Sequence, residues 1–408
     1  MKRVVVTGMG VVSPVGRTVE SFYTTLLESR SGICFHDFPW GRALVAPVLG
    51  DIDADFPKIR RLSLDRVAQL ALLAARQAVT QAAIQFADAP GDSTGIYWGT
   101  GIGGATTLES SYRDLFINHA ARLRPVTIVA TMNNAATGQI GIEFGIRGPS
   151  YTYSSACSSS AVAIGEAYRA IRFGLIQTAV VGGAEAMLTE GGIKAWESLQ
   201  TLAKPDTDRP ETSCRPFSAD RSGFVLGEGA GAVILEEAES AVVRGATILA
   251  EIVGYGNTTD ACHITQPDAG GQSRAMSMAI AEAGINATAV QYINAHGTGT
   301  KVGDISETRA IKQVFGEAAY SVPISATKAL HGHLMGATGA VEFVAALEAL
   351  RTRTIPPTAH LFQRDPDCDL DYVIEGMRPL RELNVVMSNS FGFGGNNVAL
   401  IARRYRHS

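Results

Sequence analysis

Short runs of β-branched residues alternate with alanine-rich stretches along the whole chain, and this alternation constrains the fold more than any other feature. The β-branched runs are typical of buried strands, and the alanine-rich stretch 65–85 is typical of a helix. Such alternation predicts βαβ units, in which helices cover both faces of largely buried strands. The strands that we expect span residues 4–7, 95–98, 179–181, 233–235, 248–253 and 292–295.

The length leaves two organisations open. A chain of 408 residues can form two ordinary domains or one large architecture built from two similar halves. No proline- or serine-rich linker separates two autonomous units. The best candidate for a boundary is the acidic, alanine-rich stretch 241–245. With 46% hydrophobic and 18% charged residues, the composition predicts a compact, core-rich α/β protein.

Charge and cysteine content exclude several classes of protein. The net charge of −4 gives no basic excess for binding nucleic acid. The five cysteines are odd in number and lack a C-x-x-C pair, which argues against a disulfide framework and a zinc site and favours a reducing cytoplasm. The longest apolar run, 70–75, is too short to span a bilayer, and glycines interrupt the N-terminal apolar run before it could serve as a signal peptide. We therefore expect a soluble, cytoplasmic protein.

Cys157 stands where a β-prone segment meets an alanine-rich helix. Residues 148–160 read G-P-S-Y-T-Y-S-S-A-C-S-S-S, and Gly174 ends the helix that follows. Unpaired amide groups and the positive end of the helix dipole favour a thiolate at such a turn. Taken alone, Cys157 fits an ordinary core cysteine better than a reactive one, because buried unpaired cysteines are common.

Two further segments place histidines among small residues. Residues 294–300 read N-A-H-G-T-G-T around His296, and residues 325–339 read S-A-T-K-A-L-H-G-H-L-M-G-A-T-G around Lys328, His331 and His333. Backbone and substrate can approach closely at such glycine-rich turns. The paired histidines, with a lysine five residues before one of them, suggest a shared site.

The C-terminal segment 388–397 reads S-N-S-F-G-F-G-G-N-N after an expected strand at 384–387. A glycine-rich turn of this kind can direct backbone N–H groups at a developing oxyanion. A plain tight turn is the alternative interpretation.

Together these motifs resemble those of the β-ketoacyl-(acyl carrier protein) synthases of the KAS I and KAS II type. The motifs S-S-A-C-S-S-S, N-A-H-G-T-G-T, T-K-x-x-x-G-H and N-S-F-G-F-G-G occur in that order, and V-V-V-T-G-M-G-V-V-S-P-V-G (4–16) and R-P-F-S-A-D-R-S-G-F (215–224) extend the resemblance over nearly the whole chain. It implies an α/β thiolase fold, five-layered αβαβα, built from two similar halves with mixed, mostly parallel sheets. The halves would be residues 1–245, with the nucleophilic cysteine, and residues 246–408, with the histidines and lysine.

The resemblance also implies an activity, a decarboxylating Claisen condensation of malonyl-acyl carrier protein with an acyl chain held on a cysteine. Cys157 would carry the acyl chain, His296 and His333 would stabilise the enolate, and the N–H groups of Cys157 and Phe393 would hold the oxyanion. Other matched positions have supporting roles: Lys328 paired with Glu342, Thr298 and Thr300 on the pantetheine arm, Phe224 beside the leaving carboxylate, and Ile102 lining the acyl pocket.

No cofactor or metal of the enzyme's own is implied, because phosphopantetheine arrives on the carrier protein. The implied partners are acyl carrier protein and a second subunit, either a copy of this chain or a chain-length factor. Asn294, Ala295, Glu342, Ser388 and Asn389 match a monovalent-cation position of some relatives. An acidic carrier would need local positive charge, for which Arg60, Arg61, Arg66, Arg122 and Arg124 are the candidates.

Two positions depart from the fatty-acid synthases of this family and leave the pathway open. His331 and Asn396 stand where threonine is usual, so a specialised polyketide or aryl polyene pathway is the alternative to fatty-acid synthesis. Three related classes of protein fit the sequence less well. A thiolase would carry a second cysteine in the C-terminal turn, and a KAS III type synthase would use a histidine and an asparagine in place of the two histidines. A chain-length factor would have lost the nucleophilic cysteine.

Three motifs are decoys on this interpretation. The segment 99–104 matches G-x-G-x-x-G, but no acidic residue ends a second strand about 20 residues later, as dinucleotide binding requires. The glycine-rich segment 227–232 leads into a strand instead of a helix. The pair His331 and His333 lacks the acidic ligands of a metal site.

Overall fold

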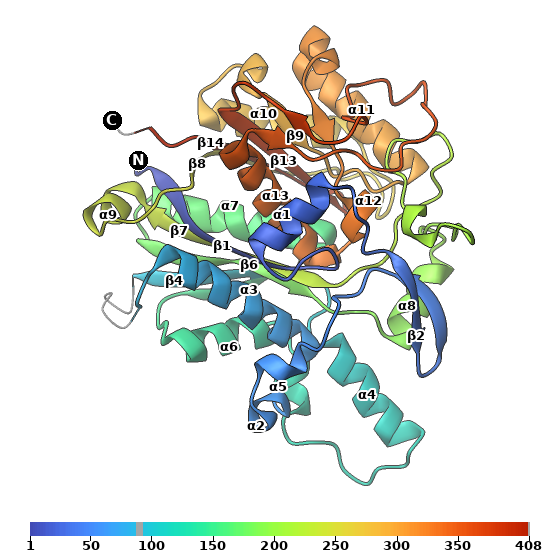
Figure 1. Cartoon of the computed structure of the whole chain (residues 1–408). Helices are drawn as coiled ribbons and strands as arrows, with labels where there is room; N and C mark the ends of the chain where they lie inside the picture. The colour runs from blue at the N-terminus through green and yellow to red at the C-terminus, as the bar shows by residue number, and fades with distance from the viewer. Residues whose placement is uncertain (87–92, 407–408) are drawn as a thin grey trace.

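A ten-stranded mixed sheet runs through the computed structural model, in which residues 1–86 and 93–406 are described (Figure 1). The strands lie in the order β10-β9-β13-β14-β8-β1-β7-β6-β4-β5. They are β1 (Val4–Val12), β4 (Thr94–Gly99), β5 (Ser150–Tyr153), β6 (Thr178–Glu185), β7 (Gly229–Glu237), β8 (Ala250–Thr259), β9 (Tyr292–Asn294), β10 (Ile324–Ser325), β13 (Val385–Gly392) and β14 (Asn396–Arg403).

The sheet consists of two sets of five strands with the same internal order. The first set reads β5-β4-β6-β7-β1 and the second β10-β9-β13-β14-β8. Numbered along the chain within each set, both read third, second, fourth, fifth, first. The sets meet where β1 pairs antiparallel with β8 over three residue pairs. The expectation of two similar halves is confirmed.

Helices complete the layers. In Figure 1, α7 and α13 lie between the two sets of strands, α3 and α6 cover the outer face of the first set, and α10 and α11 cover that of the second. This is the expected five-layered αβαβα arrangement. The helices of these layers are α3 (Arg66–Ala82), α6 (Ala135–Phe144), α7 (Ser159–Arg172), α10 (Ala269–Ala283), α11 (Lys301–Phe315) and α13 (Thr338–Thr352).

The remaining elements lie around these layers. They are α1 (Val19–Leu27), α2 (Lys58–Arg61), α4 (Ala105–Phe116), α5 (Thr127–Thr131), α8 (Glu190–Ser198), α9 (Ala238–Val243), α12 (Lys328–His331), the hairpin β2 (Cys34–Phe38) with β3 (Gly41–Val45), and the pair β11 (Thr354–Ile355) with β12 (Arg378–Pro379). Two short 3₁₀ turns, η2 (Ala156–Ser158) and η6 (Met335–Ala337), directly precede α7 and α13.

The strand directions correct one expectation. Each half has two parallel and two antiparallel pairings, and the pairing between the halves is antiparallel, so the sheet is mixed but not mostly parallel. Helical crossovers between neighbouring strands give the parallel pairs. The antiparallel pairs arise because β14 returns from β13 through a tight turn and β7 lies against β1 and β6.

Every expected strand is present, but β1 is longer than its apolar run suggests. Gly8 and Gly10 interrupt that run in the sequence, yet both lie within the strand. A side-chain carbon on either glycine would come within 2.0 Å of a carbonyl oxygen of α3, at Ala78 or Ala74. The glycines therefore let the strand pack directly against the helix. Helix α3 itself begins where expected, with the Asp65 side chain accepting the Val67 N–H at 2.9 Å.

No helix within residues 1–86 and 93–406 has both the length and the apolar character needed to cross a bilayer.

Candidate active site

Cys157 lies in a sharp turn between β5 and α7. The preceding residue, Ala156, has a φ of +51°, a left-handed conformation that costs an L-residue energy and occurs where a turn must present a side chain. Cys157 is buried, and its side chain lines the floor of a cavity of about 400 Å³. The strand-to-helix position expected for Cys157 is confirmed.

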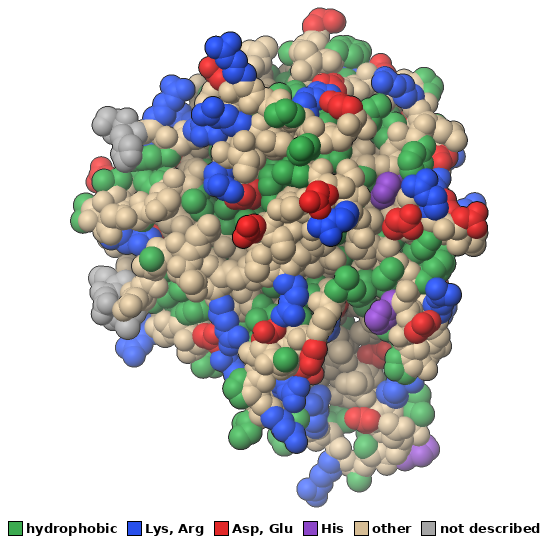
Figure 2. Space-filling view, viewed as in Figure 1, with side chains coloured by type: hydrophobic (Ala, Val, Ile, Leu, Met, Phe, Trp, Pro, Cys, Tyr) green, Lys and Arg blue, Asp and Glu red, His purple; other side chains and the backbone are tan. Residues whose placement is uncertain are grey.

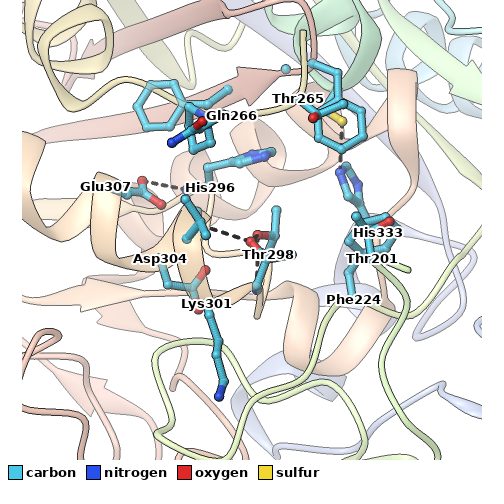
Figure 3. Close-up of a pocket in the computed structure, with 18 of the residues that line it drawn as sticks. Thr201, Phe224, Thr265, Gln266, His296, Thr298, Lys301, Asp304, Glu307 and His333 are labelled. Carbon is cyan, nitrogen blue, oxygen red and sulfur yellow. Dashed lines mark hydrogen bonds between the residues drawn. The ribbon is translucent and has the colours of Figure 1, made fainter. Parts of the chain in front are cut away.

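His333 faces the sulfur of Cys157. Its Nε2 lies 3.1 Å from Cys157 Sγ (Figure 3). Its Nδ1 accepts the backbone N–H of Met335 at 3.2 Å and lies 2.9 Å from the Thr338 hydroxyl. A neutral imidazole carries one proton, so a donor at Nδ1 leaves that proton on Nε2. His333 therefore presents an N–H to the sulfur and to any oxygen that binds beside it.

His296 completes the group. Its ring lies 5.6 Å from that of His333, nearly perpendicular to it. Lys328 Nζ lies 3.4 Å from His296 Nδ1 and 2.8 and 2.9 Å from the two oxygens of Glu342. Lys328 also donates to the His296 carbonyl, and its ammonium cannot accept a hydrogen bond, so Nδ1 carries no proton and His296 holds its proton on Nε2. The expected pairing of Lys328 with Glu342 is present, and both side chains are completely buried.

Burial dominates the protonation of all three reactive groups. It raises the pKa of the Cys157 thiol to about 11, although the Lys328 charge and the N–H groups of Phe393 and Cys157 lower it. The resting sulfur therefore keeps its proton, contrary to the expectation of a thiolate. Burial and the neighbouring Lys328 charge hold the pKa values of His296 and His333 well below the ordinary value.

A direct prediction follows for the imidazoles. At about pH 5.5 an ordinary histidine is about nine-tenths charged, whereas His296 and His333 should remain neutral because protonation would bury a charge beside Lys328. Nitrogen NMR of histidine-labelled protein should show that the ring signals of His296 and His333 do not move between about pH 8 and pH 5.5, and the signal of the buried His331, whose pKa is lowered to about 3, should also stay fixed. The exposed His36 and His119 supply reference signals. Titration of the His296 and His333 rings near the ordinary pKa would contradict the assigned environment.

Phe393 supplies a second backbone donor at the sulfur. Its N–H acts on the Cys157 sulfur together with the N–H of Cys157 itself. Phe393 follows the last residue of β13, so the strand extends beyond the expected 384–387, and the turn is confined to 393–395. The Asn396 side chain donates to the Phe393 carbonyl at 3.3 Å and so braces this turn. Two N–H groups beside the sulfur are placed to reach an oxygen that develops next to it, as an oxyanion hole requires.

Three other expected residues line the cavity. The Phe224 ring lies 5.1 Å from the His333 ring, and Figure 3 shows it beside that histidine. Thr298 and Thr300 line the other side, with their hydroxyl oxygens 2.9 Å apart. Thr300 also caps α11 by accepting the Gly303 N–H at 3.2 Å. The cavity is open to solvent, so an extended substrate arm can reach Cys157 along these threonines.

One expectation from the sequence does not hold in the single chain. Ile102 is half exposed and does not line the cavity, because its turn lies at the surface beside the edge strand β5. His331 is fully buried in the same short helix as Lys328, its Nδ1 donates to the Gly332 carbonyl, and its Nε2 lies 2.9 Å from the Thr327 hydroxyl.

Two acidic residues were missed. Glu307 accepts the backbone N–H groups of His296 and Gly297, both at 2.8 Å, and Asp304 accepts the Gly299 N–H at 3.1 Å. They hold the loop that carries His296 and the threonines. Their spacing of three residues puts them on one face of the helix after N-A-H-G-T-G-T, which is the signal that could have revealed them.

The ligand atoms of Cys157, His296 and His333 lie within 4.8 Å of one another, close enough to hold a metal ion. Metal binding through Nε2 would require both histidines to lose the proton that their hydrogen bonds assign to that atom. Elsewhere, the side-chain oxygens of Asn294, Ser388 and Asn389 are buried without hydrogen-bond partners. Unpaired oxygens of this kind fit the monovalent-cation position that these residues match in some relatives.

Comparisons with known proteins agree with this geometry. Residues 1–241 match the family model "Beta-ketoacyl synthase, N-terminal domain", and residues 249–362 match "Beta-ketoacyl synthase, C-terminal domain". The chain is 40% identical to 3-oxoacyl-[acyl-carrier-protein] synthase 2 of Staphylococcus aureus (strain N315), over 99% of each chain.

Solved structures are similar over the whole length. The ishigamide ketosynthase/chain length factor gives a TM-score of 0.92 at 32% identity, covering 99% of this chain and 100% of the other. A type II polyketide synthase ketosynthase, in complex with its acyl carrier protein and bound to the hexaketide, gives a TM-score of 0.91 at 30% identity with the same coverage. This chain belongs to the β-ketoacyl synthase family, whose members are carbon–carbon bond-forming acyltransferases.

Proposed function

We propose that this protein is a 3-oxoacyl-(acyl carrier protein) synthase that uses Cys157, His296 and His333 as its reacting groups. The observation that carries the proposal is the convergence of a buried thiol, two neutral imidazole N–H groups and two backbone N–H groups on one cavity. In this proposal the halves are residues 1–245 and 246–408, and each contributes part of the site.

The first step is transfer of an acyl group to Cys157. The sulfur attacks the thioester of the acyl carrier protein, the bond from the carbonyl carbon to the pantetheine sulfur breaks, and an acyl-Cys157 thioester forms. The thiol proton leaves Cys157 and the departing pantetheine sulfur gains one, so no resident base has to store it. The N–H groups of Cys157 and Phe393 stabilise the tetrahedral oxyanion.

The second step is loss of carbon dioxide from malonyl-acyl carrier protein. The electrons of the bond to the carboxylate move into the thioester, and the oxygen that becomes an enolate accepts hydrogen bonds from Nε2 of His296 and His333. Because both imidazoles are neutral, they act as hydrogen-bond donors without having to give up a full proton. Phe224 provides an apolar wall that disfavours the charged carboxylate and favours neutral carbon dioxide.

The third step forms the new carbon–carbon bond. The enolate carbon attacks the acyl-Cys157 carbonyl, the same two N–H groups hold the oxyanion, and the Cys157 thiolate leaves and takes a proton from solvent. Lys328, fixed by Glu342, keeps the His296 proton on Nε2 throughout. Thr298 and Thr300 would bind the phosphopantetheine arm, which enters with the carrier protein, so we propose no resident cofactor.

Reconstitution tests the function directly. Wild-type protein, malonyl-acyl carrier protein and an acyl-acyl carrier protein should give one 3-oxoacyl product for each carbon dioxide released, measured by mass spectrometry and carbonate capture. Hydrolysis without any 3-oxoacyl product would overturn the assignment.

A specialised pathway is the second candidate, because two solved relatives are a type II polyketide ketosynthase and an ishigamide ketosynthase with its chain length factor. A panel of saturated and polyenoyl carrier proteins separates the two. Turnover of saturated medium and long chains supports fatty-acid elongation, and turnover confined to conjugated chains supports the specialised pathway.

The carrier protein would dock where free positive charge is available. Lys and Arg side chains lie over the end formed by α2, α4 and α5 (Figure 2). Arg66 is held by Glu228 at 2.6 Å, Arg60 is paired with Glu143, and Arg61 lies 3.5 Å from Asp53. Arg122 and Arg124 are exposed, and residues 1–86 and 93–406 contain no ion-pair partner for either. These two are therefore the better candidates.

Reversing both charges, Arg122→Glu with Arg124→Glu, should raise KM for acyl carrier protein about five- to tenfold because an acidic partner loses its attraction. Turnover of a small acyl thioester should not change. The exposed Arg381 supplies the matched control, Arg381→Glu. Equal loss with both substrates, or no loss with either, would remove these arginines from docking.

A second subunit is the other proposed partner. Strand β5 is an edge strand of the sheet, and the apolar side chains of Ile102, Ile128, Met132 and Tyr151 are exposed around it. The turn that carries Ile102 is joined to this edge by the Ser154 hydroxyl, which donates to the Gly101 carbonyl at 3.0 Å. An uncovered edge with apolar neighbours is a typical interface. A subunit seated there would bury Ile102, which then lines the acyl pocket only in the assembled enzyme.

Wild-type protein should therefore sediment as a dimer, whereas Ile128→Asp should sediment as a monomer because an unpaired carboxylate would have to be buried. Val243→Asp, at an exposed valine of α9, is the control and should remain dimeric. A wild-type monomer that condenses long acyl chains at full rate would contradict the proposed interface.

A further inference from the structure

Glu185 is the last residue of strand β6, and its carboxylate is completely buried. It takes no part in the proposed reaction steps. One oxygen accepts the N–H groups of Gly101 at 2.6 Å and Gly336 at 3.0 Å. The other accepts the Ile102 N–H at 3.2 Å and the Thr100 hydroxyl at 3.3 Å. Every partner is a donor, so the site needs a group that only accepts. These hydrogen bonds also occupy backbone N–H groups of the G-x-G-x-x-G segment 99–104. A bound phosphate would need the same N–H groups.

These bonds join two segments that lie apart in the sequence. One is the turn that carries Ile102, and the other is η6, which begins two residues after His333. A side-chain carbon at Gly101 or at Gly336 would come within 2.7 Å of the shared Glu185 oxygen. Both glycines are therefore explained by the close approach of their backbones to this carboxylate.

The η6 segment supplies one of the two contacts at His333 Nδ1, and the Thr338 hydroxyl supplies the other. Met335 has a φ of +45°, a left-handed conformation that is unfavourable for a residue with a side chain and has to be held by its surroundings. In this conformation its N–H donates to His333 Nδ1 at 3.2 Å. The next amide, that of Gly336, is the one bound by Glu185.

We propose that Glu185 is a positioning residue that holds Met335 and Gly336 so that His333 keeps its proton on Nε2, and that joins this histidine to the turn carrying Ile102. The inference rests on the proposed function for its catalytic consequence, but its structural content can be measured without activity.

Two substitutions separate geometry from charge. Glu185→Gln keeps the size of the side chain but turns an NH₂ group toward N–H donors. Glu185→Asp keeps the charge but withdraws both oxygens by one methylene. Both should loosen η6, while only the glutamine variant removes a negative charge that, after burial, helps to raise the pKa of the Cys157 thiol.

Nitrogen NMR of histidine-labelled protein is the first readout. Wild type should show His333 with its proton on Nε2, and both variants should show a mixture of the two tautomers. The second readout is malonyl decarboxylation in a Cys157→Ala background, which should fall about ten- to a hundredfold in both variants because one enolate donor is lost part of the time. The third is the pH dependence of Cys157 alkylation by iodoacetamide, whose midpoint should fall in Glu185→Gln and stay unchanged in Glu185→Asp.

A general loss of structure would not produce this split between the two variants. Unchanged tautomer and unchanged decarboxylation in a folded Glu185→Gln protein would overturn the inference. Failure of both variants to fold, judged by circular dichroism, would assign Glu185 to stability alone and also overturn it, unless the milder Thr100→Val variant shifts the tautomer in a folded protein. If the wild-type protein showed no malonyl decarboxylation, the proposed function would be wrong. The inference about Glu185 would then be decided by the NMR measurement of the His333 tautomer.

Discussion

Cys157→Ala should abolish condensation while malonyl decarboxylation continues. Without the sulfur no acyl thioester can form on the enzyme, so the loss of 3-oxoacyl product should be at least on the order of 10⁴-fold. Decarboxylation depends on the Nε2–H groups of His296 and His333, which this substitution leaves in place. The measurement is simultaneous assay of carbon dioxide and 3-oxoacyl product from wild type and variant.

Labelling with a radioactive acyl-acyl carrier protein provides the structural check. Wild type should carry the acyl group on the peptide that contains Cys157, and the variant should carry none. Cys262→Ala is the matched control because Cys262 is the exposed cysteine of residues 1–86 and 93–406. A variant that still condensed, or label on Cys262 alone, would remove Cys157 from the reaction.

His333→Ala has the second-largest expected effect. Loss of the Nε2–H donor at the enolate oxygen should slow malonyl decarboxylation about a hundred- to a thousandfold, the usual cost of removing one such donor. Acylation of Cys157 should persist, because the N–H groups of Cys157 and Phe393 remain. Separate measurement of the acylation burst and of carbon dioxide release distinguishes the two steps.

His119→Ala, at an exposed histidine, is the control for His333→Ala and should behave as wild type. If His333→Ala released carbon dioxide at the wild-type rate, His333 would have no role in enolate stabilisation. If it failed to accept the acyl group, its role would lie in the first step instead.

Much of the fold was predictable because the strand and helix patterns are local. The strand around residues 179–181 was found because burial on both faces leaves a run of apolar residues in the sequence. The helix 65–85 was found from its alanine-rich composition. The strand directions were not found, since they depend on which strands become neighbours after folding. β1 was cut short in the sequence for a related reason: Gly8 and Gly10 look like breaks until the backbone of α3 is seen against them.

The residues of the site were also only partly predictable from the sequence. Cys157, His296 and His333 could be named because reactive side chains stand out among small residues, and the structure brings all three together. The resting protonation of Cys157 could not be read from its turn, because burial opposes the helix end and outweighs it. Ile102 was assigned to the acyl pocket, but it does not line the cavity of the single chain. Glu185 gave no signal in the sequence, since three of its four donors are backbone amides, which every sequence contains.

The repeated order of strands in the two halves has a consequence for how the site became asymmetric. The turns η2 and η6 occupy equivalent places, each before a central helix, each opening with a residue of left-handed φ, Ala156 in one and Met335 in the other. They also contact one another. An approximate twofold axis between the halves therefore brings the two equivalent turns, η2 and η6, together in the site. The turn η2 presents the nucleophile Cys157, and the turn η6 orients His333 beside it. Two equivalent turns of a pseudosymmetric fold therefore have different roles, and neither half could form the site alone.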